Sequence, residues 1–325
     1  MNAVANSVVN SILSIKPLAR FAKSRARSMM MDRAETLGVY WRDEVKALQR
    51  RGDEIDLPQS GSEKGAVISP IWEQELATVI SPDVTYPAYY KTSFHAYEEG
   101  NLGWLPAMEV DVAARAVHAR IWPDGDERAG IAGDSSLRQS YHRVLKSALP
   151  ELPERIVDLG SSAGRSTFTL QETFPNAQLT GVELSPYFVA VAQYMDQQRE
   201  HSANHPVRWV HAPAEATGLP DSSVDLVSAC LVFHELPLSA ANEIMAEAYR
   251  LLRPGGHFAI MDMNPGCDTF VKMPPYVLTL LKSTEPYLDQ YFSLDMDEAF
   301  QAAGFTSPKI VVNSPRHRTV IGRKL

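Results

Sequence analysis

The sequence has little cysteine and no long apolar run. Its two cysteines, Cys230 and Cys267, cannot form the framework of disulfides that staples small secreted domains. No stretch approaches the roughly 20 consecutive apolar residues that a membrane-spanning helix needs. With 45% hydrophobic and 22% charged residues in 325, the composition is that of a globular chain with a sufficient core.

Acidic residues are absent from residues 2–31, although the chain as a whole is acidic. Residues 1–50 carry nine Lys/Arg and four Asp/Glu, whereas the remainder carries 22 and 35. An acidic remainder argues against a large nucleic-acid footprint, so we expect no nucleic-acid partner. Within residues 2–31, Val4, Val8 and Ile12 recur at helical spacing ahead of the basic residues.

Three interpretations of residues 2–31 stay open. A basic amphipathic helix could lie on an anionic membrane surface. A segment that is rich in Arg and Ser and free of acids is also typical of an organellar transit peptide. The third interpretation is a helix that packs on its own domain or on a second copy in a homodimer. Because the apolar part precedes the charges, a secretory signal is disfavoured, and we expect a cytoplasmic protein, with peripheral membrane contact as one alternative.

One loop of the sequence has glycine at only some of the positions that a dinucleotide-binding loop requires, which restricts the kind of nucleotide that it could bind. An apolar run that contains Asp158 turns through a small-residue loop, Gly160 to Gly164, into a helical pattern. Glycine at both ends of the loop permits positive φ and close approach of a ligand, and the next helix opens with unpaired N–H groups. The dinucleotide fingerprint would need glycine at Ser162 and Arg165. A diphosphate is therefore disfavoured, and Asp158 would repel one.

A second acid follows at the spacing of a ribose-binding residue. Glu183 stands 23 residues after Gly160, at the end of another apolar run. An acid in this position can accept hydrogen bonds from both hydroxyls of a ribose. The two segments together indicate a nucleoside-cofactor site at the carboxyl edge of a parallel sheet.

The loop resembles the first motif of class I S-adenosylmethionine-dependent methyltransferases, usually Asp/Glu-x-Gly-x-Gly-x-Gly. Later landmarks follow in family order over roughly residues 140–323, at 181–185, 214–227, 234–236 and 249–256. The pattern is most similar to small-molecule methyltransferases of the ubiquinone and menaquinone pathways. Two positions depart from it: Ser162 replaces the middle glycine, and Pro213 stands where an acid often binds the adenine amino group. Adenine recognition would then use backbone, Glu215 or another group.

Strands and helices alternate from residue 155 onward, which predicts parallel strands joined by crossover helices. Strands are expected near 155–159, 178–183, 207–211, 224–231 and 256–263, and the short link between 309–313 and 318–321 can only join antiparallel strands. We expect an α/β, Rossmann-like fold with a seven-stranded, mostly parallel sheet and a C-terminal antiparallel hairpin. This domain spans 140–325, and 1–139 is a mainly helical N-terminal extension or lid region, with a helix over 106–118. The resemblance implies that the helix beginning near Gln139 covers the cofactor.

The resemblance implies S-adenosylmethionine as the cofactor. It implies that Asp158 engages the methionine amino group, directly or through water, that Glu183 holds the ribose and that Leu184 packs on adenine. The full set of expected cofactor-binding residues is Asp158, Gly160, Ser161, Ser162, Gly164, Glu183, Leu184, Ala214, Glu215 and Leu231.

Methyl transfer from a sulfonium is an in-line displacement, so positioning supplies much of the catalysis, and a base is needed only when the nucleophile must lose a proton. His234 and Glu235, just beyond the fourth strand, are the candidate catalytic pair, and a structural hydrogen bond is the alternative for His234. The candidate acceptor-binding residues are His95, Tyr97, Tyr141 and His142, for which ordinary packing is the alternative. His201 and His205 have no third ligand in the sequence, so no metal is expected.

We therefore expect transfer of a methyl group from S-adenosylmethionine to oxygen or carbon of a small acceptor. The apolar segment 274–292 indicates a lipophilic acceptor, although core packing explains the same pattern equally well. Two alternatives stay open: a non-catalytic S-adenosylmethionine-binding scaffold, and an NAD(P)-dependent oxidoreductase, which the Ser162 and Arg165 mismatches and the terminal hairpin disfavour.

Overall fold

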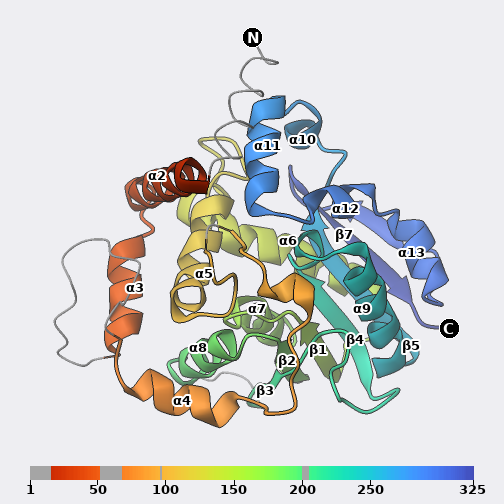
Figure 1. Cartoon of the computed structure of the whole chain (residues 1–325). Helices are drawn as coiled ribbons and strands as arrows, with labels where there is room; N and C mark the ends of the chain where they lie inside the picture. Colours follow the sequence, from red (N-terminus) through yellow and green to blue (C-terminus); the bar gives the residue numbers. More distant parts are fainter. Residues whose placement is uncertain (1–15, 52–67, 96, 200–204) are drawn as a thin grey trace.

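A seven-stranded sheet is the scaffold of the molecule (Figure 1), seen in a computed structural model that describes residues 16–51, 68–95, 97–199 and 205–325. The strand order is β3-β2-β1-β4-β5-β7-β6. All neighbours from β3 to β5 pair in parallel, whereas β7 is antiparallel to both β5 and β6. The expected α/β fold with a C-terminal antiparallel hairpin is confirmed. The strands are β1 (Arg155–Leu159), β2 (Gln178–Glu183), β3 (Arg208–His211), β4 (Val224–Cys230), β5 (Leu252–Met263), β6 (Lys309–Val312) and β7 (His317–Arg323).

Strand β5 begins four residues earlier than the sequence predicted. In its pairing with β4, Leu252 lies opposite Val224, and the next paired residue, His257, lies opposite Leu226. The residues of β5 between Leu252 and His257 therefore form a bulge in the ladder. Gly255 in this bulge has a φ of +85°, which a side chain would disfavour. The Pro-Gly-Gly sequence therefore marks a bulge inside the strand and not the loop before it.

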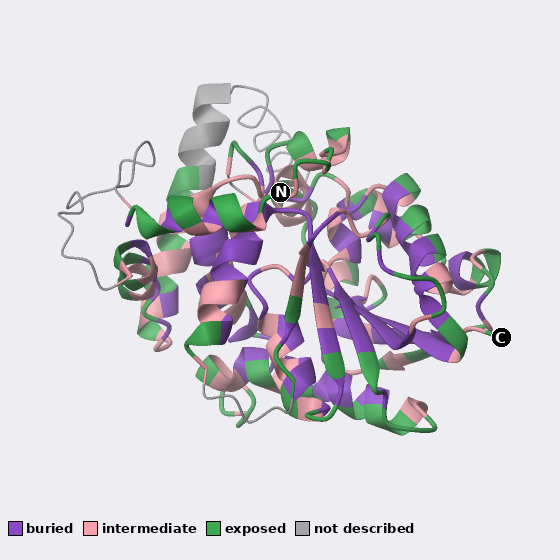
Figure 2. Cartoon of the chain, turned by 90° about the horizontal axis from the view of Figure 1, so that it is seen from below, coloured by how far each residue is buried: buried purple, intermediate pink, exposed green. Residues whose placement is uncertain are grey.

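Apolar side chains alternate between the two faces of the sheet and form two separate core clusters. Along β5, Phe258 and Ile260 belong to one cluster, and Ala259 and Met261 belong to the other. The first cluster lies against α9 (Leu238–Leu251), α12 (Leu288–Ser293) and α13 (Met296–Ala302), and the second against α6 (Gly133–Ala148) and α7 (Arg165–Thr173). Figure 2 shows the strands as the buried centre of the molecule.

The N-terminal helices form a third core cluster against α8 (Pro186–Gln197). Trp41, Trp72 and Met108 are fully buried there, together with Phe188 and Val191 of α8. The helices are α2 (Lys16–Thr36), α3 (Trp41–Arg50), α4 (Ile71–Val79) and α5 (Trp104–His118). The short turn η1 (Ala88–Lys91) lies between α4 and α5, and η2 (Gly130–Ala132) follows α5. The expected helix over 106–118 is present and begins two residues earlier. The N-terminal region is thus packed on the sheet domain through a shared apolar core.

Helix α6 begins at Gly133 and not near Gln139. A Cβ on Gly133 would lie 2.2 Å from the carbonyl oxygen of His118, so only glycine lets the two helices meet at this point. In the next position the buried Asp134 carboxylate contacts His118 at 2.7 Å and Arg165 at 2.6 Å. The added first turn is therefore fixed by tertiary contacts that helical periodicity does not reveal.

The remaining helical pieces are η3 (Phe233–Glu235), α10 (Asp268–Val271) and α11 (Pro275–Thr284). No helix within the described residues combines the length and apolarity needed to cross a bilayer. Of the basic segment 2–31, the part before Lys16 lies outside the described residues, as does His201.

Candidate active site

The loop between β1 and α7 has a backbone that only small residues can adopt. Gly160 and Gly164 have φ values of +67° and +91°, and a Cβ on either would come within 2.7 Å of Val232 or 2.6 Å of Phe168, respectively. Ser162, in the middle position, is also left-handed, with a φ of +51°. Its N–H group donates to Glu183 Oε2 at 2.9 Å. The loop is therefore tied to the end of the neighbouring strand β2.

Asp158 is a buried acid with one oxygen left for a ligand. Its Oδ2 accepts hydrogen bonds from Ser166 Oγ at 2.6 Å and Thr167 Oγ1 at 2.7 Å, both in the first turn of α7. Its Oδ1 is buried and has no hydrogen-bond partner among the described residues, and the same is true of the neighbouring Ser161 Oγ. Burial raises the pKa of Asp158 above its ordinary value. An incoming donor, above all a cationic one, would relieve this unpaired acceptor.

Glu183 ends strand β2 and is held on both oxygens. Oε1 accepts from the Ser185 N–H at 2.8 Å and from the Tyr90 hydroxyl at 3.0 Å, in addition to the Ser162 bond on Oε2. Burial raises its pKa. The next residue, Leu184, is buried beside it.

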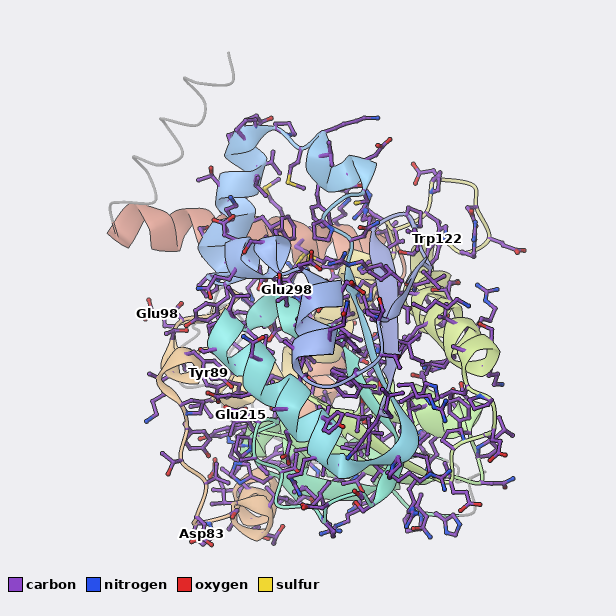
Figure 3. All side chains as sticks on the ribbon, turned by 90° about the vertical axis from the view of Figure 1, so that its right-hand side faces the viewer. Asp83, Tyr89, Glu98, Trp122, Glu215 and Glu298 are labelled. Carbon is purple, nitrogen blue, oxygen red and sulfur yellow. The ribbon has the colours of Figure 1, made fainter. Side chains whose placement is uncertain are left out.

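Glu215 lies beyond β3 and is held by a second tyrosine of the N-terminal region. Tyr89 donates to Glu215 Oε1 at 2.9 Å, and Figure 3 shows the two side chains next to one another. Glu215 Oε2 is buried without a hydrogen-bond partner among the described residues. Ala214 is partly buried against the core, and Leu231, at the end of β4, takes a strained φ of +61°.

A second group of polar side chains lies beyond β4. The buried His234 contacts Asp262 Oδ1 through Nδ1 at 2.8 Å, and its backbone N–H donates to Asp262 Oδ2 at 3.1 Å. Burial opposes the imidazolium, but Asp262 and nearby carboxylates outweigh burial and raise the pKa of His234 to about 10. For Glu235, burial raises the pKa to about 7 although His95 and His234 act in the opposite direction.

His95 joins this group from the N-terminal region. Its Nε2 lies 3.1 Å from Glu285 Oε1 and 3.8 Å from Glu235 Oε1. The Nε2 of His234 lies 3.9 Å from the same Glu235 oxygen. The backbone of His95 is left-handed, with a φ of +50°, and its N–H donates to Thr284 O at 3.0 Å. Burial opposes its charge, but Glu285 raises its pKa. The Glu235 carboxylate therefore lies between two imidazoles.

Residues 157–260 match the sequence profile of a family described as "Methyltransferase domain". This stretch therefore carries a methyltransferase domain, in agreement with the resemblance to class I S-adenosylmethionine-dependent methyltransferases. A demethylmenaquinone methyltransferase of Thermus thermophilus is 28% identical over 123 residues, or 38% of this chain and 53% of that protein. An arsenite methyltransferase of Halobacterium salinarum is 30% identical over 198 residues, or 59% and 47%. The chain thus spans about half the length of these curated relatives.

Among solved structures, a candidate O-methyltransferase from Nostoc punctiforme shares the fold. The TM-score is 0.52 at 12% sequence identity, and the match covers 78% of this chain and 68% of that one. The similarity extends beyond the methyltransferase domain into the N-terminal region, since it includes more than three quarters of the chain.

Three of the expected acceptor-binding residues make other contacts and do not join the polar group around Glu235. Tyr97 donates to Glu109, which is also paired with Arg27 of α2. Tyr141 is buried and contacts Ser228 Oγ at 3.0 Å in the core. His142 contacts Thr173 Oγ1 at 2.7 Å, and burial lowers its pKa to about 3. Of the four expected acceptor-binding residues, His95 alone contacts the polar group of His234, Glu235 and Glu285.

Four residues of the site were missed in the sequence. Asp262 contacts His234, and Glu285 contacts His95. Tyr89 donates a hydrogen bond to Glu215, and Tyr90 donates one to Glu183. Asp262 ends strand β5, so the rule that ligands bind beyond the carboxyl ends of parallel strands could have found it. The aromatic density around Tyr89 indicated a pocket wall but no individual contact.

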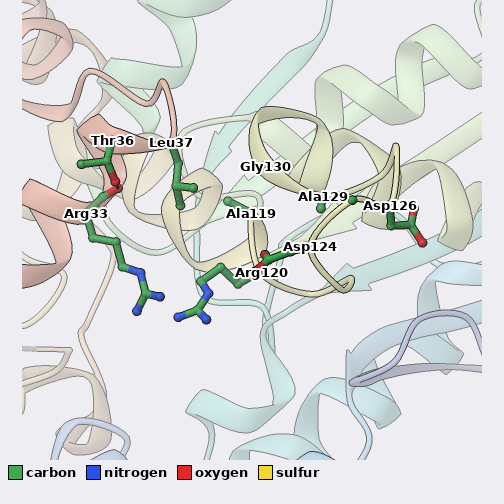
Figure 4. Close-up of a pocket in the computed structure, with 10 residues that line it drawn as sticks. Arg33, Thr36, Leu37, Ala119, Arg120, Asp124, Asp126, Ala129 and Gly130 are labelled. Atoms are coloured by element: carbon green, nitrogen blue, oxygen red, sulfur yellow. Dashed lines mark hydrogen bonds between the residues drawn. The ribbon is translucent and has the colours of Figure 1, made fainter.

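A separate surface hollow of about 470 Å³ lies between the end of α2 and residues 119–130 (Figure 4). Arg33 and Arg120 extend toward one another across it. None of the expected site residues lines this hollow.

Proposed function

We propose that the protein transfers the methyl group of S-adenosylmethionine to a small molecule whose reacting atom loses a proton. The proposal rests on two groups of side chains at one edge of the sheet. The first group contains Asp158 and Glu215, each with a buried oxygen that has no hydrogen-bond partner among the described residues. The second group contains the imidazoles and carboxylates around Glu235. The first group suits a cationic nucleoside cofactor, and the second suits proton removal from an acceptor.

The residues at this edge fit S-adenosylmethionine. Asp158 would bind the amino group of the methionine part, because its Oδ1 is buried and unpaired among the described residues. Glu183 would bind the ribose, with Leu184 and Ala214 against the adenine. Glu215 would accept from the adenine amino group through its unpaired Oε2, a role that Pro213 cannot fill. When bound, the cofactor supplies a methyl group that its sulfonium already activates.

Glu235 is the residue we propose as the general base. A pKa of about 10 keeps His234 protonated at neutral pH, so its imidazole cannot accept a proton there. Glu235, with a pKa of about 7, is substantially ionised at neutral pH and still basic enough to take one. In this assignment Asp262 positions His234, which remains a fixed cation, and the proton of a hydroxyl or an acidic C–H passes to the Glu235 carboxylate.

We propose that α11 forms an apolar wall beside the acceptor. The helix contains Val277, Leu278 and Leu281, and none of its residues is fully buried. Its C-terminal end reaches the polar group, since Thr284 accepts from the His95 N–H. An acceptor with an apolar body and one reactive polar atom would fit both surroundings.

We also propose that the end of the molecule formed by α2 and α11 contacts an anionic membrane surface. Both helices lie at the same end in Figures 1 and 3, with Arg25 exposed on α2 and Tyr276 and Leu280 exposed on α11. Flotation of the full chain with anionic, but not neutral, vesicles is expected, and deletion of residues 2–31 should abolish it. Failure of the full chain to float with anionic vesicles would refute this contact.

Transfer of labelled methyl from S-adenosylmethionine to a small-molecule extract tests the proposed activity. We expect label in a low-molecular-weight product with the wild type and a large loss with Glu235→Gln. The matched control is Glu243→Gln, which alters an exposed acid on α9 and should leave the transfer unchanged. A protein that binds the cofactor but labels nothing would instead be a scaffold.

A further inference from the structure

One short segment of the N-terminal region contacts the acids of both sites. Residues 86–95, here called the tyrosine strap, place Tyr90 on Glu183, Tyr89 on Glu215 and His95 on Glu285. Each acid belongs to a different part of the methyltransferase domain. The strap therefore joins the cofactor acids to the acceptor group through hydrogen bonds and an ion pair.

The Tyr90 hydroxyl uses a place on Glu183 that a ribose would need. A carboxylate offers about four acceptor sites, and Glu183 already receives the N–H groups of Ser162 and Ser185 as well as Tyr90. A ribose diol brings two further donors to the same two oxygens. Burial raises the pKa of the Tyr90 phenol well above its usual value, so the hydroxyl stays protonated and remains a donor.

The adjacent Tyr89 does not compete with a ligand for Glu215. Tyr89 donates only to Oε1 of Glu215, and the buried Oε2 has no hydrogen-bond partner among the described residues. A ligand donor can therefore reach Glu215 without displacing Tyr89. The bond from Tyr89 also fixes the direction in which the free oxygen points.

We propose that Tyr90 is a stand-in for the cofactor ribose, which displaces its hydroxyl from Glu183, whereas Tyr89 remains on Glu215 as a positioning residue. This inference rests on the proposed function. His95 lies five residues further along the same strap, so displacing Tyr90 removes one of the contacts that hold this segment. The bond of Tyr89 to Glu215 and the bond of the His95 N–H to Thr284 O remain.

Calorimetric titration with S-adenosylhomocysteine separates the two tyrosines. Tyr90→Phe removes the competing donor and should lower Kd by about three- to tenfold, the value of one ordinary hydrogen bond. Tyr89→Phe removes the donor that holds Glu215 Oε1, so Oε2, unpaired among the described residues, is no longer held in position and Kd should rise by about threefold. Tyr86→Phe is the matched control, because its hydroxyl lies near His211 Nε2, at 3.4 Å, and touches none of these acids. Its Kd should equal that of the wild type.

A ligand without ribose hydroxyls distinguishes competition from a general change in the fold. With an S-adenosylhomocysteine analogue that lacks both hydroxyls, Tyr90→Phe and the wild type should bind equally. An unchanged or higher Kd of Tyr90→Phe for S-adenosylhomocysteine, in a variant with wild-type thermal unfolding, contradicts the proposal. A gain that persists with the analogue contradicts it as well. Absence of binding by both the wild type and the variant contradicts the proposed function itself.

Discussion

The methyltransferase domain and the N-terminal region contribute opposite halves of the same hydrogen bonds. The domain supplies Glu183, at the end of β2, and Glu215, beyond β3, and the N-terminal region supplies the donors Tyr90 and Tyr89. His95 and Glu285 repeat this arrangement in the acceptor group. Glu183 ends a strand and Glu215 follows one, whereas Tyr89 and Tyr90 lie in the short turn η1 of the strap. The hydrogen bonds at this sheet edge are thus shared between the sheet and a segment of the N-terminal region.

On the side of the methyltransferase domain, the largest effect is expected from Glu235, the residue that we propose as the general base. Glu235→Gln should lower kcat by about 10²- to 10⁴-fold, the usual contribution of a positioned base. The Kd for S-adenosylhomocysteine should change little, because no cofactor-binding residue is altered. Methyl-transfer kinetics and calorimetry on the same variant measure the two quantities. A kcat within threefold of the wild type would remove Glu235 from the mechanism.

The pH profile sharpens the same assignment. The base must be ionised, so kcat/KM should fall as the pH drops below about 7, the pKa of Glu235. It should also fall as His234 loses its proton near pH 10. In Glu235→Gln the acidic limb should vanish while the basic limb stays. An acidic limb that persists in the variant would belong to another group.

The next largest effect concerns Glu183, the acid that we propose binds the cofactor ribose. Glu183→Ala should raise the Kd for S-adenosylhomocysteine on the order of 10²-fold, because two hydrogen bonds to a charged acceptor are lost. Glu172→Ala serves as the control, since this exposed acid lies on α7, away from the sheet edge, and pairs with Arg199. Calorimetry gives both constants. Equal affinity of Glu183→Ala and the wild type would refute the ribose assignment.

A smaller effect is expected on the side of the N-terminal region. His95→Gln removes the ion pair with Glu285 and should lower kcat/KM by about tenfold, with less than a twofold change in the Kd for S-adenosylhomocysteine. A change confined to cofactor affinity would show that the strap serves only the cofactor site. Steady-state kinetics with one acceptor, compared with calorimetry, separates these outcomes.

The smallest effect is on stability. Ser162 holds a left-handed φ of +51° in the cofactor loop, and relief of that strain by Ser162→Gly should raise the free energy of unfolding by about 0.5–1 kcal/mol. Ser161→Gly, one residue earlier and without a left-handed backbone, should bring no such gain. Chemical denaturation of the two variants measures the difference. A less stable Ser162→Gly would mean that the hydroxyl, and not the backbone, is what the loop uses.

Local sequence signals were sufficient for the sheet and for half of the site. The alternation of strands and helices predicted the parallel order, and the short link before β7 predicted the antiparallel end, because each depends on the chain nearby. The positions of Asp158 and Glu183 were predictable for the same reason, since each lies at or next to the end of a recognisable strand. The contacts of Tyr90 and Glu285 were not, because they join residues far apart in the sequence, 93 positions in the case of Tyr90 and Glu183.

Calorimetric titration of the wild type with S-adenosylmethionine, S-adenosylhomocysteine and NADH tests the central claim most directly. The claim is that this sheet edge binds a sulfonium nucleoside and not a dinucleotide. Micromolar binding of the first two ligands, with no heat from NADH, is the predicted result. Binding of NADH alone would contradict the account, because the loop with Ser162 and Arg165 would then have to hold a diphosphate beside Asp158.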